Sequence, residues 1–430
     1  MTVVRWFGLL SCALLGACGT LSNAGHEDRG DQNLPSAGVA PWDKVDLDGD
    51  ATNLIQPWVL EVEPASDRAS EPSAAFARDR IVLTYTRTGP PERSGIWRTE
   101  APSPEELYGT GPGGRVLEAS LAWEAGQVGA PALIFDEALG GAEPYRLWYE
   151  GGGGRGLGLA SSPDGIRWAK HGAPVLVPDQ EWEGGRVSAP TVVRVGDELW
   201  LWYEGGDGAG IGFATSRDGI TWVKSGPGPV FTSALDWEGA STPDIAPGHV
   251  GSPSVILDAS QSPPRFGLYY TGFVAVERNP LTASRLDDVT PGARNRSIGY
   301  AASTDGVHWT RADATMNPVV AEKTPLEIGE VPFPPELAAA LPDLVLAVLR
   351  AVLGVDESGY PSLPALETVI DEGAPCVVGD GPDRFLMLFE QGNSLFVPLA
   401  LELPPSVVTT PLGILVPNTR IGLALARSRR

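Results

Sequence analysis

The chain has 430 residues and a formal net charge of −23, from 54 acidic and 31 basic side chains. Such an acidic chain repels phosphate backbones, so nucleic acid is not expected among its partners. Glycine and proline are abundant, at 53 and 40 residues, but 42% of residues are hydrophobic, which favours a packed core over a disordered chain. Beyond the N-terminus, no apolar stretch reaches the length of about 18 residues that a transmembrane helix needs.

The N-terminus has the pattern of an export signal. Arg5 precedes an apolar run, Trp6 to Ala17, that is too short for a permanent span. The sequence Leu-Gly-Ala-Cys ending at Cys18 resembles the bacterial lipobox, in which a peptidase cuts before the cysteine that carries the lipid. We therefore expect a signal peptide over 1–17 and an exported protein anchored to the membrane through Cys18. Gly19, by resemblance to Gram-negative lipoproteins, indicates the outer membrane. The alternative is an ordinary signal peptide with an incidental cysteine.

Residues 18–56 are rich in Gly, Asp, Asn, Pro and Ala, and we expect a flexible tether there. After Cys12 and Cys18, only Cys376 remains, so no internal disulfide is expected.

The most informative signal is a long internal repeat. The hairpin sequence Ser-x-Asp-Gly-x-x-Trp occurs three times, ending at Trp168, Trp222 and Trp309. Each repeat begins with a strand led by a proline, and the spacings between these prolines are 59, 59, 63 and 122 residues: Pro72, Pro131, Pro190, Pro253 and Pro375. A Tyr-Glu-Gly strand and a Gly-rich strand follow. The pattern predicts an all-β, five-bladed propeller of four-stranded antiparallel blades over 57–428. The alternative is a string of β-sandwiches, which the repeat length disfavours because each sandwich would need about 100 residues.

Two features modify the regular repeat. The fifth unit lacks an outer strand, and Pro57–Leu60 has the outer-strand pattern, so we expect an N-terminal strand to close the last blade. An irregular loop is expected over 273–296. A helical insertion is expected over 324–370, with its helix near 335–354. Packing against a blade, a lid role and contact with a membrane surface stay open for this helix.

The order of proline-led strand, Trp-Tyr-Glu-Gly strand, Ser-x-Asp-Gly-x-x-Trp hairpin and Pro-Val run resembles the five-bladed propeller glycosidases of families 43, 32, 68 and 130. The resemblance covers roughly 57–428 and implies oligo- or polysaccharide as the partner. It also implies catalytic carboxylates at the axis, typically directly before the proline of an inner strand. An axial calcium is implied by the resemblance only, and no metal-ligand spacing appears in the sequence.

Glycoside hydrolysis needs two carboxyl groups, one as acid and the other as base or nucleophile. Glu71 is the only acidic residue directly before one of the five prolines, and Glu372 and Asp371 precede the last proline closely. These three are the candidate catalytic residues. The candidate sugar-binding residues stand four positions before the prolines or in an insertion of the fourth repeat: Arg68, Gln127, Arg186, His249 and Asp244. The alternative is that they are solvated loop residues.

Other acidic residues recur at matching places in the repeats. Glu150, Glu204 and Glu390 end the Tyr-Glu-type strands, and three more follow tryptophans: Glu124, Glu183 and Glu238. Repetition predicts a structural role for them. The first hypothesis is therefore a monomeric, lipid-anchored propeller that acts on or binds glycans. The alternative is a non-catalytic propeller that binds glycans or serves as a protein scaffold, and the incomplete carboxylate pattern leaves open whether the chain is an enzyme.

Overall fold

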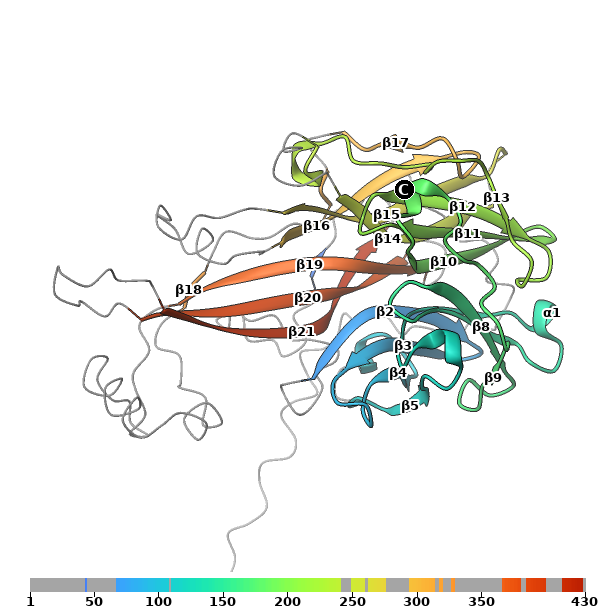
Figure 1. Cartoon of the computed structure of the whole chain (residues 1–430), viewed down its shortest axis with the longest axis horizontal. Coiled ribbons are helices and arrows are strands. Elements are labelled where there is room, and N and C mark those ends of the chain that lie inside the picture. The colour runs from blue at the N-terminus through green and yellow to red at the C-terminus, as the bar shows by residue number, and fades with distance from the viewer. Residues whose placement is uncertain are drawn as a thin grey trace, which may run out of the picture.

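The computed structural model describes residues 43–44, 67–107, 110–240, 249–259, 262–275, 294–313, 317–319, 326–328, 366–379, 384–399 and 412–427 (Figure 1). Cys18, Asp244, the segment 57–60 and the expected helix near 335–354 lie outside the described residues. Within the described part, no helix is long and apolar enough to cross a membrane.

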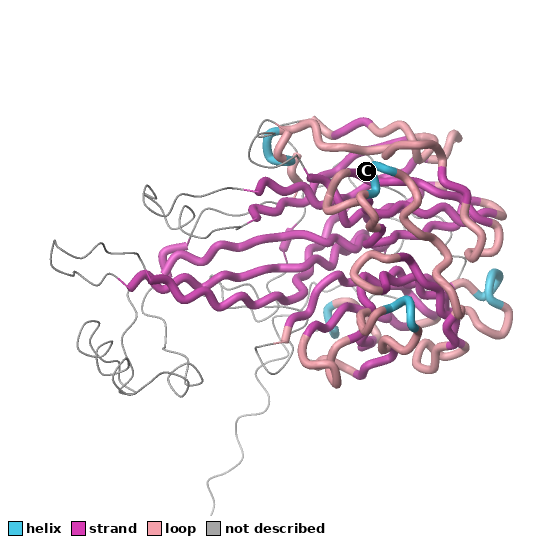
Figure 2. The backbone as a smooth tube through the Cα atoms, in the orientation of Figure 1, coloured by secondary structure: helices cyan, strands magenta, loops and turns pink. Residues whose placement is uncertain are grey.

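The described chain is all-β, with antiparallel sheets arranged as a propeller (Figure 2). Four sheets have four strands each, in chain order from the innermost strand outward. Their strands are β2 (Arg68–Ala77), β3 (Arg80–Thr88), β4 (Gly95–Ala101), β5 (Gly114–Leu117); β6 (Val128–Phe135), β7 (Tyr145–Gly151), β8 (Gly156–Ser162), β9 (Ala169–Lys170); β10 (Val187–Val195), β11 (Glu198–Gly205), β12 (Gly210–Ser216), β13 (Val223–Lys224); and β14 (His249–Asp258), β15 (Arg265–Ala275), β16 (Arg294–Ser303), β17 (Thr310–Arg311).

Helical structure in the described residues is limited to short turns between strands. These are the 3-10 helices η1 (Glu105–Leu107), η2 (Ala122–Glu124), η3 (Glu181–Glu183) and η4 (Asp236–Glu238), and the α-helix α1 (Glu137–Gly140).

The fifth sheet departs from the expected four-stranded form. It has five strands in the order β1 (Asp43–Lys44), β21 (Leu412–Arg427), β20 (Arg384–Leu399), β19 (Leu366–Gly379) and β18 (Leu326–Ile328). Its three central strands project beyond the ring (Figure 1). Both ends of the expected 324–370 insertion therefore belong to this sheet, because β18 pairs with the start of β19.

An N-terminal strand does join the last sheet, as expected, but the described partner of β21 is Asp43–Lys44 rather than 57–60. Lys44 faces Ala424, as Lys170 faces Ala160 and Lys224 faces Ala214 in the regular sheets. The reason is in the sequence: the motif Trp-x-Lys of the outer strands also occurs over 42–44. Two residues of the expected tether thus take the outer-strand position.

Apolar clusters pack between neighbouring sheets all the way around the ring. One cluster unites Leu83 of the first sheet with Leu388 of the fifth, so the last sheet packs against the first. Hydrogen bonds between inner strands follow the same path: Ser254 Oγ accepts from Val377 N at 2.9 Å, and Cys376 Sγ accepts from Ala74 N at 3.2 Å. The buried cysteine therefore helps to close the ring.

The repeated hairpins have the structural role expected from the sequence. The hydroxyl of Ser162 accepts a hydrogen bond from Gly165 N, and Asp164 Oδ1 accepts one from Arg167 N, both at 2.8 Å. The hairpin of one sheet also binds the preceding sheet, since the buried Trp202 donates to the carbonyl of Gly306 at 2.8 Å.

The bounds expected for the irregular loop, 273–296, are wrong at both ends. β15 continues to Ala275 and β16 begins at Arg294, and these two residues pair. The hairpin extends because antiparallel pairing simply continues past the ring. Arg296 consequently stands on a strand, opposite Phe273.

Candidate active site

Every inner strand has the same irregularity near its start. The pairing of each inner strand shifts around the residue before the proline, which forms a β-bulge. These residues all have positive φ angles, between 42° and 51°: Glu71, Ala130, Ala189, Ser252 and Ala374. A positive φ is strained for residues other than glycine, and such strain concentrates at functional sites.

The bulges place residues of one sheet against the side chains of the preceding sheet. Ala130 N donates to Thr86 Oγ1 at 2.8 Å, and Ser252 N donates to Glu204 Oε2 at 2.9 Å. The acceptor in each case stands near the end of a second strand. Gly251 leaves room for this contact, because a Cβ there would lie 2.0 Å from Glu204 Oε2. The ends of the second strands therefore meet at the axis.

Four partly buried glutamates lie near the axis of the ring, at the end where the inner strands begin: Glu71, Glu150, Glu204 and Glu390. Glu71 Oε2 accepts hydrogen bonds from Thr86 Oγ1 at 2.7 Å and from Ala130 N at 2.9 Å. Glu390 forms an ion pair with Arg296 at 2.8 Å. The side-chain carboxyl of Glu150 accepts no hydrogen bond from the part of the chain that the structure describes.

Burial and mutual repulsion raise the pKa values of Glu71, Glu150 and Glu204. Burial raises the pKa of Glu150 to about 8, the charges of Glu71 and Glu204 add to this, and Arg186 opposes it. Burial also raises the pKa of Glu204 to about 7. For Glu71, burial and the charge of Glu390 raise the pKa, while the bonds from Thr86 and Ala130 act against the rise. A carboxyl that keeps its proton near neutral pH can serve as a general acid.

The predicted sugar-binding residues stand at or just before the starts of the inner strands, at the same end of the channel. Arg186 reaches the cluster electrostatically, because its charge lowers the pKa values of both Glu150 and Glu204. Arg68 and Gln127 are exposed. The His249 ring stacks on Phe273 with 4.3 Å between centroids, and its Nδ1 lies 2.7 Å from the carbonyl oxygen of Asp207.

The predicted carboxylates of the fifth sheet lie further along the projecting strands. Glu372 pairs with Gln391 and Asp371 with Gly392, whereas Gly373 pairs with Glu390. The side chains of Glu372 and Asp371 lie outside the described residues, so their catalytic role stays a prediction. In the described part, the fifth sheet contributes Glu390 to the cluster.

The sequence argument missed Glu150, Glu204 and Glu390 because it assigned every repeated glutamate to structure. That reasoning suits Glu124, which is fully buried and accepts hydrogen bonds from Tyr149 and Lys170. The same reasoning fails for the glutamates at the end of the second strand. Copies of a residue that lies next to the axis of a ring come close together in space, so they can form one site. The register of the second strands could have found these residues. Each glutamate pairs with the residue directly before a bulge: Glu150 with Gly129, Glu204 with Ser188 and Glu390 with Gly373.

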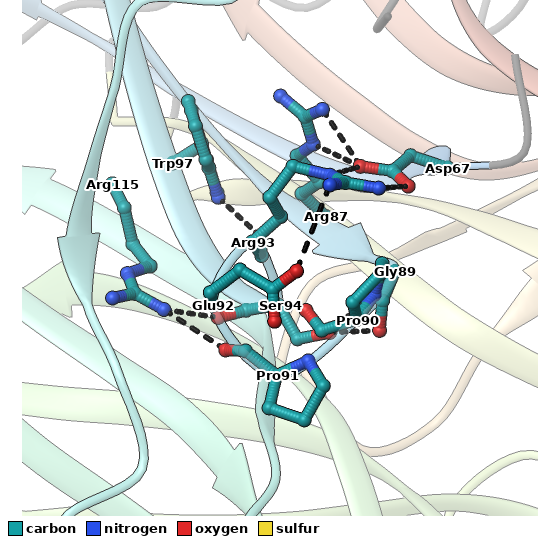
Figure 3. A network of polar contacts seen from close by, with 10 residues as sticks. All are labelled: Asp67, Arg87, Gly89, Pro90, Pro91, Glu92, Arg93, Ser94, Trp97 and Arg115. Carbon is teal, nitrogen blue, oxygen red and sulfur yellow. Dashed lines mark hydrogen bonds and ion pairs between the residues drawn. The ribbon is translucent and has the colours of Figure 1, made fainter. Parts of the chain in front are cut away.

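A second charged network flanks the same end of the first sheet (Figure 3). Asp67 is fully buried and accepts two hydrogen bonds from Arg93, at 2.7 and 2.9 Å, and two from Arg87, at 2.9 and 2.7 Å. The bond from Arg93 is the main cause that holds the pKa of Asp67 below its usual value. Arg87 also lies over the Trp97 ring, 4.5 Å from its centroid. The loop 89–94 is thereby fixed beside the mouth of the channel.

Among the residues that the structure describes, no group of three or more His, Cys, Asp or Glu side chains is placed to hold a metal ion. The axial calcium implied by the resemblance stays a prediction, and no step derived below uses a metal ion.

A cavity of about 900 Å³ continues along the inner strands beyond the prolines. All five inner strands line it, with residues such as Ser73, Thr191 and Ser254. The carboxyl cluster stands where these strands begin, and Arg78 and Arg194 stand where two of them end.

No family model and no curated protein matches the sequence. Several solved structures resemble the chain. One is a thermostable family-43 glycoside hydrolase, 14% identical, with 84% of this chain and 89% of that chain covered and a TM-score of 0.45. Another is a GH130 glycoside hydrolase structure described as targeting β-1,2 mannosidic linkages in Candida mannan, 13% identical, with 93% and 99% covered and a TM-score of 0.49. A third is the α-L-arabinofuranosidase from Lactobacillus brevis, 12% identical, with 83% and 92% covered and a TM-score of 0.43.

What the site of this chain can do is therefore argued from its own residues.

Proposed function

We propose that the chain is a glycoside hydrolase whose catalytic carboxyls are Glu150 and Glu71. The observation that carries the proposal is the contrast between these two neighbours. Glu150 has a pKa of about 8 and no hydrogen bond from the described residues, whereas Glu71 accepts two hydrogen bonds. A carboxylate that accepts hydrogen bonds is stabilised in its ionised form, so a proton shared by the pair resides on Glu150.

The two residues then have complementary roles. Glu150 donates its proton to the glycosidic oxygen as the bond from that oxygen to the anomeric carbon breaks. Glu71, as the carboxylate, either takes a proton from the attacking water or attacks the anomeric carbon itself. The Glu390–Arg296 ion pair adds a charge beside Glu71 that raises its pKa, and Arg296 opposes this effect.

Purified full-length chain should be screened against aryl-glycosides and plant and microbial polysaccharides, beside Glu150→Gln and Glu71→Gln. Each substitution should lower turnover by about a hundredfold or more, because each removes an acid or base. Glu198→Gln is the matched control, since Glu198 begins β11, at the opposite end from Glu204. Turnover that survives both substitutions would refute the assignment. Retention on a polysaccharide without hydrolysis would instead indicate a glycan-binding propeller.

The proposal includes attachment to the cell envelope through a lipid on Cys18, which rests on the lipobox-like sequence alone. A Cys18→Ala chain should be released from the membrane fraction and should fail to incorporate labelled fatty acid. Equal labelling of Cys18→Ala and wild type would contradict the anchor.

A further inference from the structure

The turn that follows Glu150 is built from three glycines that lie beneath polar side chains. Gly152, Gly153 and Gly154 have φ angles of 64°, 65° and 91°. A Cβ on Gly152 would meet Arg155 Cδ at 2.9 Å, one on Gly153 would meet Gln127 Oε1 at 3.2 Å, and one on Gly154 would meet Arg186 Nε at 2.9 Å. A side chain at position 153 or 154 would therefore crowd Gln127 or Arg186, and one at position 152 would crowd the carbonyl of Trp123 and the side chain of Arg155.

These arginines are exposed and weakly paired. The Arg186 side chain is 45% exposed, and its ion-pair contact, with Asp207, is long at 3.9 Å. Arg155 is exposed and its side chain forms no hydrogen bond or ion pair with the described residues. Partnered arginines elsewhere are held far more tightly, as Arg87 is by Asp67. Two guanidinium groups are therefore available to a ligand, and the charge of one of them, Arg186, acts on Glu150.

The corresponding place on the next sheet is built differently. Val187 N donates to Gly154 O at 2.9 Å, and Val250 N donates to Gly208 O at 3.0 Å in the same way. There, however, His249 lies over the glycine and stacks on Phe273. The arginine pair is thus a feature of the second and third sheets and not a consequence of the repeat.

The charge balance around Arg186 also favours an anionic ligand. Its neighbouring carboxyls are Glu150, Glu204 and Asp207, and burial raises the pKa of the first two to about 8 and about 7. Near pH 6 these two carboxyls are largely protonated and do not offset the cations, which leaves Asp207 beside Arg186 and the carboxylate of Glu71 beside Glu150. This cationic spot stands on a chain whose net charge is −23.

We propose that Arg155 and Arg186, with Gln127, bind an anionic group of a saccharide, a carboxylate or a sulfate, beside Glu150. The glycan is then an acidic one, and this choice of ligand rests on the proposed function. Guanidinium groups suit the task because they form paired, charge-assisted hydrogen bonds with such groups.

Binding to the full-length chain should be measured by calorimetry at about pH 6 with three probes of equal length: oligogalacturonate, a sulfated oligosaccharide and a neutral xylo-oligosaccharide. At least one anionic probe should bind about tenfold more tightly than the neutral one, and this preference should weaken at high salt. Arg186→Gln and Arg155→Gln should each weaken it about tenfold, and Arg186→Lys less. Arg217→Gln is the control, since Arg217 is 85% exposed and belongs to a hairpin away from the mouth.

Equal affinity for neutral and anionic probes, or anion binding that both Arg→Gln variants retain, would overturn the inference. The anionic probe whose affinity falls most in the variants identifies carboxylate or sulfate as the group bound. Hydrolysis is measured separately, so the two proposals fail independently. Arginine-dependent binding without turnover would uphold the anion site and refute the hydrolase. Turnover of neutral glycans that Arg186→Gln leaves unchanged would uphold the hydrolase and refute the anion site.

Discussion

The carboxylate of Glu71 and the backbone N–H of Ala130 are joined by a hydrogen bond of 2.9 Å across 59 residues of sequence. The bond crosses from the first sheet to the second and exists because the bulge before Pro131 turns this N–H toward the axis. It orients Glu71 and, with the Thr86 hydroxyl, favours its ionised form. The roles proposed for Glu71 as the carboxylate and Glu150 as the acid follow from this geometry.

Thr86→Val should move the acidic limb of the pH–rate profile to higher pH. The hydroxyl of Thr86 donates to Glu71, so its loss raises the pKa of the carboxyl that must be ionised. The pH dependence of kcat/KM measures this. Thr84→Val is the control, because Thr84 Oγ1 also loses a hydrogen bond, to the carbonyl of Ser73, but does not contact Glu71. An identical shift in both variants would contradict the role given to Thr86.

Stability should fall as the pH rises from about 5 to 8. The folded chain keeps protons on Glu150 and Glu204, with pKa values of about 8 and about 7, whereas the ordinary pKa of a glutamate side chain is 4.5. In this window the folded state binds more protons than the unfolded state, so the free energy of unfolding decreases with pH. Thermal unfolding at several pH values measures the slope. Glu150→Gln and Glu204→Gln should each flatten it, and Glu198→Gln should not. A slope that both axial variants retain would show that other groups cause it.

How far sequence predicts this site depends on what each signal reports. The prolines predicted the inner strands and hence the position of Glu71, because each proline follows a bulge at the axis. Arg186 was predicted from its spacing to the next proline. Glu150 and Glu204 were not, because repetition in sequence does not reveal whether the copies converge in space. The outer strand at Asp43–Lys44 was also missed, since two residues carry little pattern by themselves.

Asp67→Asn should destabilise the fold strongly, by about 3–5 kcal/mol. The substitution leaves the buried Arg87 guanidinium without its carboxylate, while Arg87 is only 3% exposed. Urea unfolding measures the loss. Arg93→Gln should cost less, because Arg93 is 31% exposed and can be hydrated in part. A loss for Asp67→Asn no larger than that for Arg93→Gln would contradict this view of the network.

Removal of β1 should weaken the closure of the ring. Asp43 and Lys44 pair with Leu425 and Ala424, so a chain that begins after Lys44 leaves the edge of β21 without this partner. Two truncations compared by thermal unfolding test this: one removes residues 1–40 and the other residues 1–44. Only the longer truncation should lower the melting temperature clearly. If the two truncated chains melt at the same temperature, residues other than β1 protect the last sheet, and the segment 57–60 becomes the next to delete.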